Sequence, residues 1–327
     1  MQVLWIGAWL GLTIAGILAM QWGANRASGL VGSLRRRWGI PAAAGGAFMG
    51  IATASPEISV NVASVAFGWP DLGLGAALGS NVPALPLAFL ISFLASRYPK
   101  EASPPPDPPP PTVQPQAVPV QVLPYLLVLA LLAALTLPPP WAGLQPVDGA
   151  ILLAAFGLYM VHVMRQARPA DREPGVRCDW SRALVGLPVI ALGALASVVA
   201  AQRLAGIFGI SELVGGLFII GLLCALPEAF AAWKLTREKK TTTAVSGAVA
   251  DGIVSLTLAL IPPALVGTAV GDIWIYGVNL AFLFSVLSAY LLLNRRRDGQ
   301  QLGLGKVSLY LGGYGVYVAA TVLILTR

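Results

Sequence analysis

Residues 50–57 read GIATASPE and residues 221–228 read GLLCALPE, so the same proline-glutamate pair recurs 171 positions later in the chain. Each pair lies inside a long apolar run, and each is followed at the same spacing by a second polar cluster, Gly79-Ser80 or Ala250-Asp251. A carboxylate at the centre of a bilayer costs at least roughly 2.5 kcal/mol, so acids placed there are usually functional. The matched pairs predict a duplicated membrane protein with one buried acid in each copy.

The composition places most of the chain in a membrane. Of its 327 residues, 57% are hydrophobic and 11% are charged, whereas about 25% of the residues of a globular domain are charged. Apolar segments long enough for a spanning helix lie near 3–20, 40–67, 71–96, 122–138, 149–166, 183–201, 213–234, 242–267, 273–293 and 307–325. These segments predict an all-α protein with ten transmembrane helices, because a transmembrane β-barrel would show alternation in ~10-residue strands.

The net charge of +7 indicates membrane topology rather than nucleic-acid binding. With ten helices, 19 of the 21 lysine and arginine residues fall in loops on one side of the membrane, and only Arg203 and Arg327 fall on the other. The positive-inside rule makes the basic side cytoplasmic and places both termini outside. We expect an integral protein of a bacterial inner membrane, surrounded by lipid, with no nucleic-acid partner. The sequence leaves the oligomeric state open.

The chain divides into two five-helix blocks, 1–166 and 183–327, joined by a cytoplasmic loop at 167–182. Because five is an odd number, the second block would enter the membrane upside down. A proline-rich stretch at 103–119 predicts an extended, poorly ordered cytoplasmic linker at 97–121 within the first block. Inverted repeats with interrupted helices are typical of secondary transporters, whose substrate site lies near the bilayer midplane.

The two prolines predict where helices 2 and 7 are interrupted. Pro56 and Pro227 each lack a backbone donor and clash with the preceding turn, so each should break its helix. Ser55 is expected to be the N-cap of a new half-helix. Such a break frees carbonyls near 51–53 and 222–224, and carbonyls together with a carboxylate suit a hard cation.

Glu57, Glu228 and Asp251 are the ionisable residues placed most deeply in the apolar segments. Three carboxylates facing one cavity cannot all be ionised and empty, because burial and mutual repulsion both oppose charge, so they must be filled by cations or protons. A protonated structural acid is the alternative reading for each glutamate. Polar neighbours one turn or one repeat away are Asn61, Ser80, Asn81 and Ser255, and of these we expect Ser80, Asn81 and Ser255 to be further cation ligands. Acids at segment ends are expected to cap helices or reach water, namely Asp71, Asp148, Glu212 and Asp272.

At these residues the sequence resembles the calcium/cation antiporter superfamily, which includes sodium/calcium and proton/calcium exchangers. In that family each repeat carries a Gly-Thr-Ser-x-Pro-Glu segment followed by a Gly-Ser-Asn segment. Residues 52–57 and 79–81 match closely, so the resemblance implies ion-ligand roles for Thr53, Glu57 and Ser80, with Glu57 as the principal ligand. In the second repeat Glu228 carries over, whereas Cys224 and Ala225 replace the hydroxyl residues.

One further departure concerns the third acid. Asp251 stands where the family has a serine, and Ser255 stands where the second repeat would have an amide or acid, so a carboxylate has moved by one helical turn. The resemblance implies a secondary active antiporter that exports Ca²⁺ in exchange for Na⁺ or H⁺ by alternating access, with no cofactor beyond the transported cations. Its first and sixth helices would move against helices 2, 3, 7 and 8. We favour protons slightly, since Na⁺ needs several weak oxygen ligands.

Three other functions are compatible with parts of the sequence. The chain could exchange a monovalent or another divalent cation for protons, or it could be a transport-inactive relative that acts as a sensor or scaffold. A membrane enzyme is disfavoured, because no metalloprotease or nucleophile motif is visible and the single histidine, His162, lies near a helix end. We therefore expect the protein not to be an enzyme.

Overall fold

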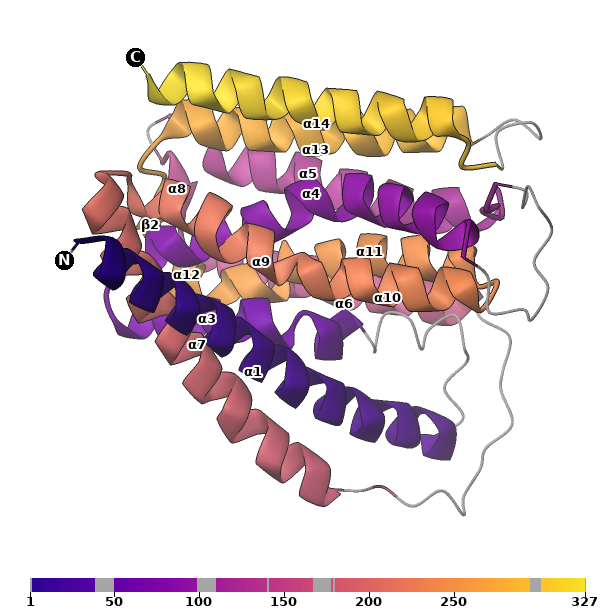
Figure 1. The fold of residues 1–327 in the computed structure, drawn as a ribbon, viewed down its shortest axis with the longest axis horizontal. Coiled ribbons are helices and arrows are strands. Elements are labelled where there is room, and N and C mark those ends of the chain that lie inside the picture. Colours follow the sequence, from indigo (N-terminus) through magenta and orange to yellow (C-terminus); the bar gives the residue numbers. More distant parts are fainter. Residues whose placement is uncertain are drawn as a thin grey trace.

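The computed structural model describes residues 2–38, 50–98, 110–139, 141–166, 178, 180–294 and 301–326, and these are almost entirely helical (Figure 1). The long helices are α1 (Gln2–Trp38), α4 (Pro70–Ser96), α5 (Ala117–Thr136), α6 (Pro146–Gln166), α7 (Trp180–Phe208), α13 (Ile273–Leu293) and α14 (Leu304–Leu325). The shorter ones are α3 (Ser55–Ala66), α8 (Glu212–Gly215), the π-helix η1 (Gly216–Gly221), α9 (Leu222–Cys224), α10 (Leu226–Arg237), α11 (Thr241–Ser255), the 3-10 helix η2 (Leu258–Leu260) and α12 (Ile261–Leu265). Strand β1 (Gly143–Leu144) pairs antiparallel with β2 (Thr268–Ala269).

The crossings confirm the predicted fold class. Nine segments of the described residues are long and apolar enough to span a membrane, and the crossing predicted at 40–67 is described from Gly50 onward, where 50–53 and α3 form its second part. Both termini lie at one end of the molecule (Figure 1), as an even number of crossings requires. We call this the termini end, and we call the opposite end, which carries the α10–α11 turn, the linker end.

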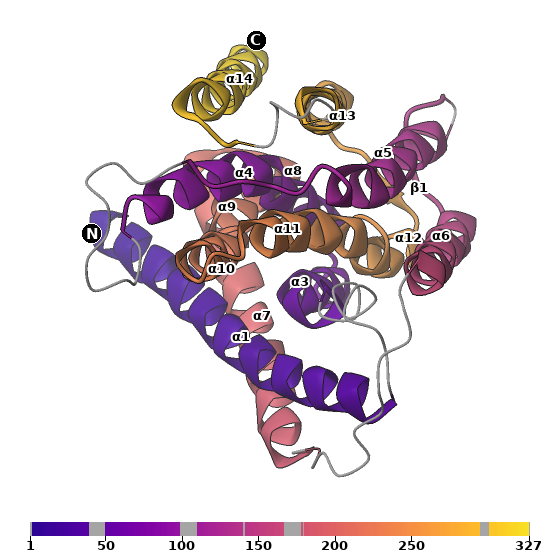
Figure 2. The ribbon, with the colours of Figure 1, turned by 90° about the vertical axis from the view of Figure 1, so that its right-hand side faces the viewer.

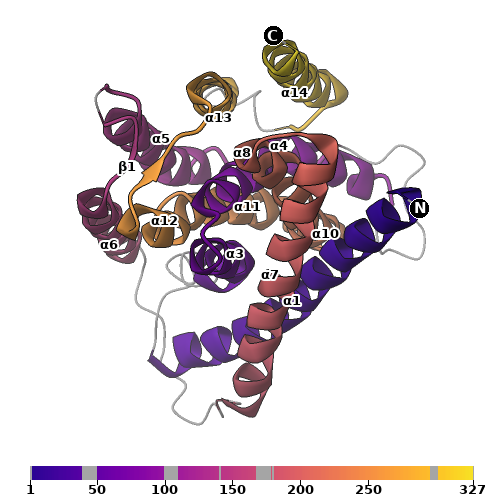
Figure 3. The same cartoon turned by 90° about the vertical axis from the view of Figure 1, so that its left-hand side faces the viewer.

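The helices form a central group flanked by two outer groups (Figures 2 and 3). Helices α3, α4, α10 and α11 lie in the centre, α13 and α14 cover one side, and α1 and α7 cross each other on the opposite side. The crossing pair is closely packed: a Cβ added to Gly23 would lie 2.6 Å from the carbonyl oxygen of Gly186. Small residues allow such close approach of helices in lipid. The central group therefore holds the residues that carry the two repeated motifs.

The two proline-containing crossings break at equivalent positions. Ala54 is the N-cap of α3 with φ −79° and ψ 3°, and Ala225 is the N-cap of α10 with φ −78° and ψ −11°. A proline follows two residues later in each case, within the first turn, where the missing N–H has no helical bond to lose. The breaks therefore place a glutamate in the first turn of each new half-helix.

The predicted cap residue is wrong. Ser55 is the first helical residue of α3 rather than its N-cap, and its hydroxyl donates to the carbonyl oxygen of Ala52 at 2.8 Å. In a regular helix the N–H of residue 56 would donate to the carbonyl of Ala52, but Pro56 has no N–H. The Ser55 hydroxyl supplies the missing hydrogen bond instead. The structure thus uses the serine to satisfy the end of the preceding helical turn, and not the beginning of the next one.

Glycines bring the backbone of α4 against the backbone of η1 and α8. A Cβ at Gly79 would lie 2.6 Å from the Cα of Leu217, and a Cβ at Gly221 would lie 2.6 Å from the Cα of Gly79. Gly75 faces the carbonyl of Leu213 in the same way. Because real Cβ atoms do not approach backbone atoms this closely, glycine is required along this seam. The seam fixes α4 against the second broken crossing.

We expect Gly79→Leu to lower the free energy of unfolding by about 1–3 kcal/mol or to prevent folding, since overpacking against backbone cannot be relieved by a rotamer change. Thermal unfolding of the purified protein in detergent would measure the loss. Gly315→Leu in α14 is the matched control, because no atom lies within 4 Å of its Cβ position. Equal losses of melting temperature in both variants would contradict a specific seam.

Several predicted boundaries need correction. The first crossing was predicted at 3–20, but α1 continues to Trp38, and the crossing predicted as one helix at 242–267 is divided into α11, η2 and α12. The linker predicted at 97–121 ends earlier, because α5 begins at Ala117. Its described part is also ordered: the N–H of Leu302 donates to the carbonyl of Pro111 at 2.8 Å, and Thr112 forms a β-bridge with Gln301. These tertiary contacts could not be read from the proline content.

Some predictions concern residues outside the described ones. They include most of the loop at 167–182, the part of the linker at 99–109, the beginning of the second crossing at 40–49, and the basic residues Lys100, Arg168, Arg172, Arg177, Arg295, Arg296, Arg297 and Arg327.

Candidate cation site

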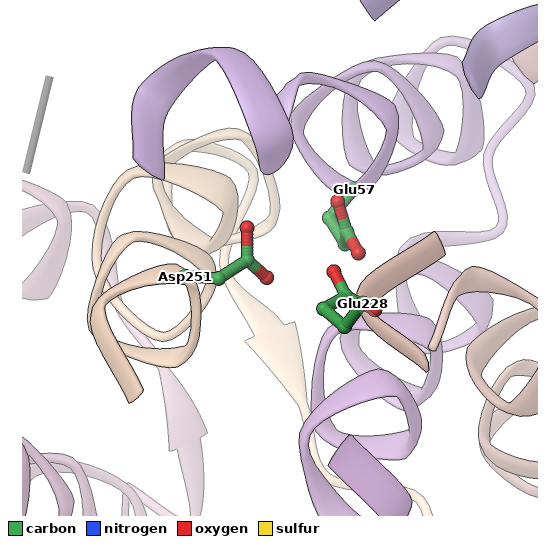
Figure 4. A group of neighbouring side chains, drawn as sticks. All are labelled: Glu57, Glu228 and Asp251. Atoms are coloured by element: carbon green, nitrogen blue, oxygen red, sulfur yellow. The ribbon is translucent and has the colours of Figure 1, made fainter. Parts of the chain in front are cut away.

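The three deeply placed acids come together in the central group of helices. Glu57 is in the first turn of α3, Glu228 is in the first turn of α10, and Asp251 is in α11. One carboxylate oxygen from each lies within 4.8 Å of those of the other two. Figure 4 shows the three side chains converging from three separate helices. Each half of the chain therefore contributes at least one acid to a single cluster.

The cluster is buried unequally. Glu57 is 1% exposed and Asp251 is 6% exposed, whereas Glu228 is half-buried. One oxygen of Glu57 and one of Glu228, Oε2 in each case, are buried without a hydrogen-bond partner. Buried polar atoms normally have partners, so these unpartnered carboxylate oxygens call for a proton or a cation at the cluster.

Thr53 completes the cluster from the helical turn before the first break. Its hydroxyl lies 2.7 Å from Oδ1 of Asp251, to which it donates, and 3.1 Å from the carbonyl oxygen of Gly50. This contact joins the first repeat to the second across the cluster. Thr53 is the only predicted hydroxyl residue that the described hydrogen bonds connect directly to one of the three acids.

We expect Thr53→Val to weaken cation binding by roughly tenfold, since a hydrogen bond to a charged group contributes about 1.5–3 kcal/mol and part of that is lost to solvent at this exposed position. Calorimetric titration with Ca²⁺ would measure it. Thr53→Ser keeps the hydroxyl and should bind nearly as well as the unsubstituted protein. If both variants lost affinity equally, the threonine would act through packing instead.

Ser80 and Asn81 lie on α4 next to the cluster, but their described hydrogen bonds go elsewhere. The Ser80 hydroxyl donates to the carbonyl of Ala77 at 3.2 Å, and Nδ2 of Asn81 donates to the same carbonyl at 2.6 Å. Oδ1 of Asn81 accepts from the hydroxyl of Tyr125 at 2.7 Å. Both residues are thus held in place by their own helix, and Asn81 also orients a tyrosine from α5.

Tyr125 is a polar residue of this region that the sequence did not single out. It is 3% exposed, and its strongest charged neighbour is Asp251. The only available signal was a tyrosine inside an apolar segment, where the buried hydroxyl requires a partner. Its partner, Asn81, lies 44 positions earlier, so no local pattern could have revealed the pair.

Ser255 lies one turn beyond Asp251 on α11. It is fully buried and its Oγ has no hydrogen-bond partner. No described contact joins it to the three acids, so its predicted role as a ligand stays a prediction. The freed carbonyls predicted near 51–53 are only partly available, because Ser55 occupies that of Ala52.

The polar residues on the two sides of the cluster differ in burial. Along the face of α11 that carries Asp251, Gly247 and Thr243 lie one and two turns nearer the linker end, and both are exposed. Thr53 is exposed as well. In the other direction, Asn61 and Ser255 are fully buried. Among the described residues on these helix faces, the polar groups beyond the cluster toward the termini end are therefore buried, whereas those toward the linker end are not.

The charges of the cluster restrict what it can hold. The charged groups that act most strongly on Glu57 and Glu228 are the other carboxylates of the cluster. With oxygen donors only, the site suits hard cations such as Ca²⁺ and Na⁺, or protons.

His162 lies on an exposed face of α6, in a groove shared with α5 residues such as Leu123 and Leu127.

Comparison with known proteins identifies the family of the chain. A family model described as sodium/calcium exchanger protein matches residues 8–165 and 180–323. The chain is 29% identical over 327 residues to the inner membrane protein YrbG of Escherichia coli (strain K12), and the match covers 94% of this chain and 95% of YrbG.

Solved structures share the fold. The sodium-calcium exchanger NCX_Mj soaked with 2.5 mM Na⁺ and 1 mM Sr²⁺ matches with a TM-score of 0.65 and 20% identity, covering 95% of this chain and 97% of that chain. The same exchanger soaked with 2.5 mM Na⁺ and 10 mM Sr²⁺ gives a TM-score of 0.64 and 21% identity, over 96% and 99% of the two chains.

Proposed function

Because the chain belongs to the sodium/calcium exchanger protein family, we propose that this cation antiporter exports Ca²⁺ in exchange for Na⁺ or H⁺ at the cluster of Glu57, Glu228 and Asp251. One observation carries the proposal: carboxylates from both halves of the chain lie within 4.8 Å of one another in the centre of the fold. Exchange at a single site requires such convergence, since both ions must use the same ligands in turn. The family is one of transporters rather than of enzymes.

Competition for charge supplies the coupling. One Ca²⁺ balances two of the three carboxylates, and a proton or a monovalent cation balances the third. When Ca²⁺ leaves, the empty cluster would concentrate three negative charges in a buried volume, which is costly. The site therefore crosses the membrane filled by one kind of cation or the other. This condition is what makes a transporter an exchanger rather than a leak.

Protons fit this cluster slightly better than Na⁺ as the coupling ion. Na⁺ needs several neutral oxygen ligands, and the second repeat carries Cys224 and Ala225 where hydroxyl residues would be expected. Thr53 is the hydroxyl that reaches the acids directly. Carboxylates alone are sufficient for proton coupling, and the cluster supplies three of them.

The location and orientation follow from charge. The basic residues gather in the loops of the linker end, for example Lys234, Arg237, Lys239 and Lys240 around the α10–α11 turn. We place this end in the cytoplasm and both termini outside, in the inner membrane of a bacterium. The similarity to an inner membrane protein supports this location.

Flux through proteoliposomes would test the proposal. Purified protein is reconstituted with a calcium dye inside, and Ca²⁺ uptake is followed after imposing a Na⁺ gradient, a pH gradient or neither. We expect uptake that follows at least one gradient. Uptake unaffected by either gradient would overturn antiport. Mn²⁺, Mg²⁺ or K⁺ exchanged for protons in place of Ca²⁺ would indicate the second candidate, a different cation/proton exchanger. Ca²⁺ binding without flux would indicate a sensor or scaffold.

A further inference from the structure

A row of buried polar groups without partners leads away from the cluster along α3. Glu57, Asn61 and Ser64 occupy one face of the helix at intervals of four and three residues, and they are 1%, 0% and 0% exposed. Oε2 of Glu57, Oδ1 of Asn61 and Oγ of Ser64 make no hydrogen bond. Because α1 leaves the termini end and the second crossing returns to it, this row points from the cluster toward the termini end (Figure 1).

The orientation of the Asn61 amide is fixed by its own helix. Its Nδ2 donates to the backbone carbonyl of Glu57 at 2.9 Å, so the amide oxygen must be the atom left over. That oxygen faces Gly73 of α4, where a Cβ would lie 2.8 Å from it and 3.1 Å from the Cβ of Ser64. Gly73 thus packs closely against two unpartnered polar groups, an approach that its lack of a side chain allows. Such an arrangement has no structural benefit in a dry helix interface.

A second helix carries a similar group in the same direction. Ser255 lies one turn beyond Asp251 on α11, as Asn61 lies one turn beyond Glu57 on α3, and its hydroxyl is also buried and unpartnered. Helix α11 runs from the linker end toward the termini end, and η2, which follows it, contacts α3. By contrast, the nearby hydroxyl of Thr257 is satisfied by the carbonyl of Ile253 at 2.6 Å. The lack of a hydrogen-bond partner is therefore confined to particular residues and is not shared by every buried hydroxyl in this region.

We propose that Asn61, Ser64 and Ser255 line the half of the cation route between the acid cluster and the termini end. This half is closed in the present structure, where all three side chains are fully buried, and it takes up water when the protein opens toward the termini end. Amide and hydroxyl oxygens can then replace part of the hydration shell of the passing cation. The inference rests on the proposed antiport function and adds the residues through which one side of the membrane is reached.

Thiol labelling tests the proposal in the full-length protein. Cys178 and Cys224 are first replaced by alanine, and a single cysteine is introduced as Ser64→Cys or Ser255→Cys, each nearly equal in size to the original residue. Ala63→Cys is the matched control, because Ala63 is 4% exposed and adjacent to Ser64 but packs in an apolar cluster. A membrane-impermeant, positively charged methanethiosulfonate, which matches the charge of the transported ion, is applied from the side of the termini to protein in proteoliposomes, with and without Ca²⁺.

We expect Ser64→Cys and Ser255→Cys to react at rates that change several-fold with Ca²⁺, and the reacted protein to lose transport, while Ala63→Cys stays unreacted. The proposal is overturned if both variants transport but never react from that side, or if Ala63→Cys reacts equally fast. If the unsubstituted protein shows no gradient-driven transport at all, the antiport function fails and this route fails with it. Labelling is measured independently of flux. A failure of the proposed route, seen as absent or unselective labelling, can therefore be distinguished from a failure of the antiport function, seen as absent transport.

Discussion

Replacing either Glu57 or Glu228 by glutamine should abolish Ca²⁺ exchange. Each glutamine keeps the size and one oxygen of the side chain but removes the charge that balances the ion. Loss of about 3 kcal/mol of ion binding corresponds to a decrease in affinity of more than 100-fold. Flux in proteoliposomes and Ca²⁺ titration would both report the loss. Glu212→Gln is the matched control, since Glu212 lies at the beginning of α8 and accepts a hydrogen bond from Gln202 at 2.9 Å outside the cluster.

The same two variants should not be less stable than the unsubstituted protein when Ca²⁺ is absent. Removing one of three mutually repelling charges relieves the empty cluster, so the melting temperature without Ca²⁺ should stay equal or rise. Addition of Ca²⁺ should raise the melting temperature of the unsubstituted protein by ligand linkage, and this increase should disappear in both variants. Full transport in either variant, or loss of transport equally in Glu212→Gln, would contradict a direct role for the two glutamates.

Asp251 is where the ion preference of this protein should be decided. Asp251→Ser removes the third carboxylate and the acceptor of the Thr53 hydroxyl. We expect Ca²⁺ affinity to fall by at least about tenfold, equivalent to 1.4 kcal/mol. The pH dependence of flux should also become shallower, because one fewer carboxylate has to lose a proton before a metal binds. Flux measured for several cations across a range of pH would show both effects.

Two further variants separate the charge of Asp251 from its hydrogen bond. Asp251→Asn can still accept from Thr53 but carries no charge, so a loss equal to that of Asp251→Ser would assign the effect to charge. The double variant Asp251→Ser with Ser255→Asp moves the carboxylate by one turn, about 6 Å along the helix. We expect it to regain divalent binding with altered selectivity. Unchanged affinity, selectivity and pH dependence in Asp251→Ser would contradict an ionic role for this residue.

The sequence was sufficient to predict the convergence of the acids because the repeat constrains it. An odd number of helices in each half requires an inverted second copy, and Pro56 and Pro227 mark equivalent breaks. Together these features bring Glu57 and Glu228 to one level of the membrane. Asp251 reaches the same level because it lies on the helix after that of Glu228, at the position equivalent to Ser80 in the first repeat. Local pattern and global symmetry agree at these positions.

Other features depended on contacts that no local pattern encodes. Ala54 rather than Ser55 caps α3, because the hydroxyl is taken by the carbonyl that Pro56 leaves unpaired. The π-helix η1 arises where its glycines meet the backbone of α4, far away in sequence. The hydrogen bond between Tyr125 and Asn81 joins α5 to α4. The length of the linker between these helices does not determine which of their residues lie opposite each other. Residues 110–116 were expected to be poorly ordered, yet their order depends on loop residues almost 200 positions later, such as Gln301 and Leu302.

Locating the ion in the protein would test the shared site most directly. Mn²⁺ is an oxygen-preferring divalent cation with a strong anomalous signal, and crystals of the protein grown with Mn²⁺ would yield an anomalous difference map. One peak within ligand distance of the carboxylates of Glu57, Glu228 and Asp251, displaced by excess Ca²⁺, is the expected result. A map with no peak at these three residues and a Ca²⁺-displaceable peak at other acids, such as Asp71 and Glu212, would contradict a cation site built from both halves of the chain.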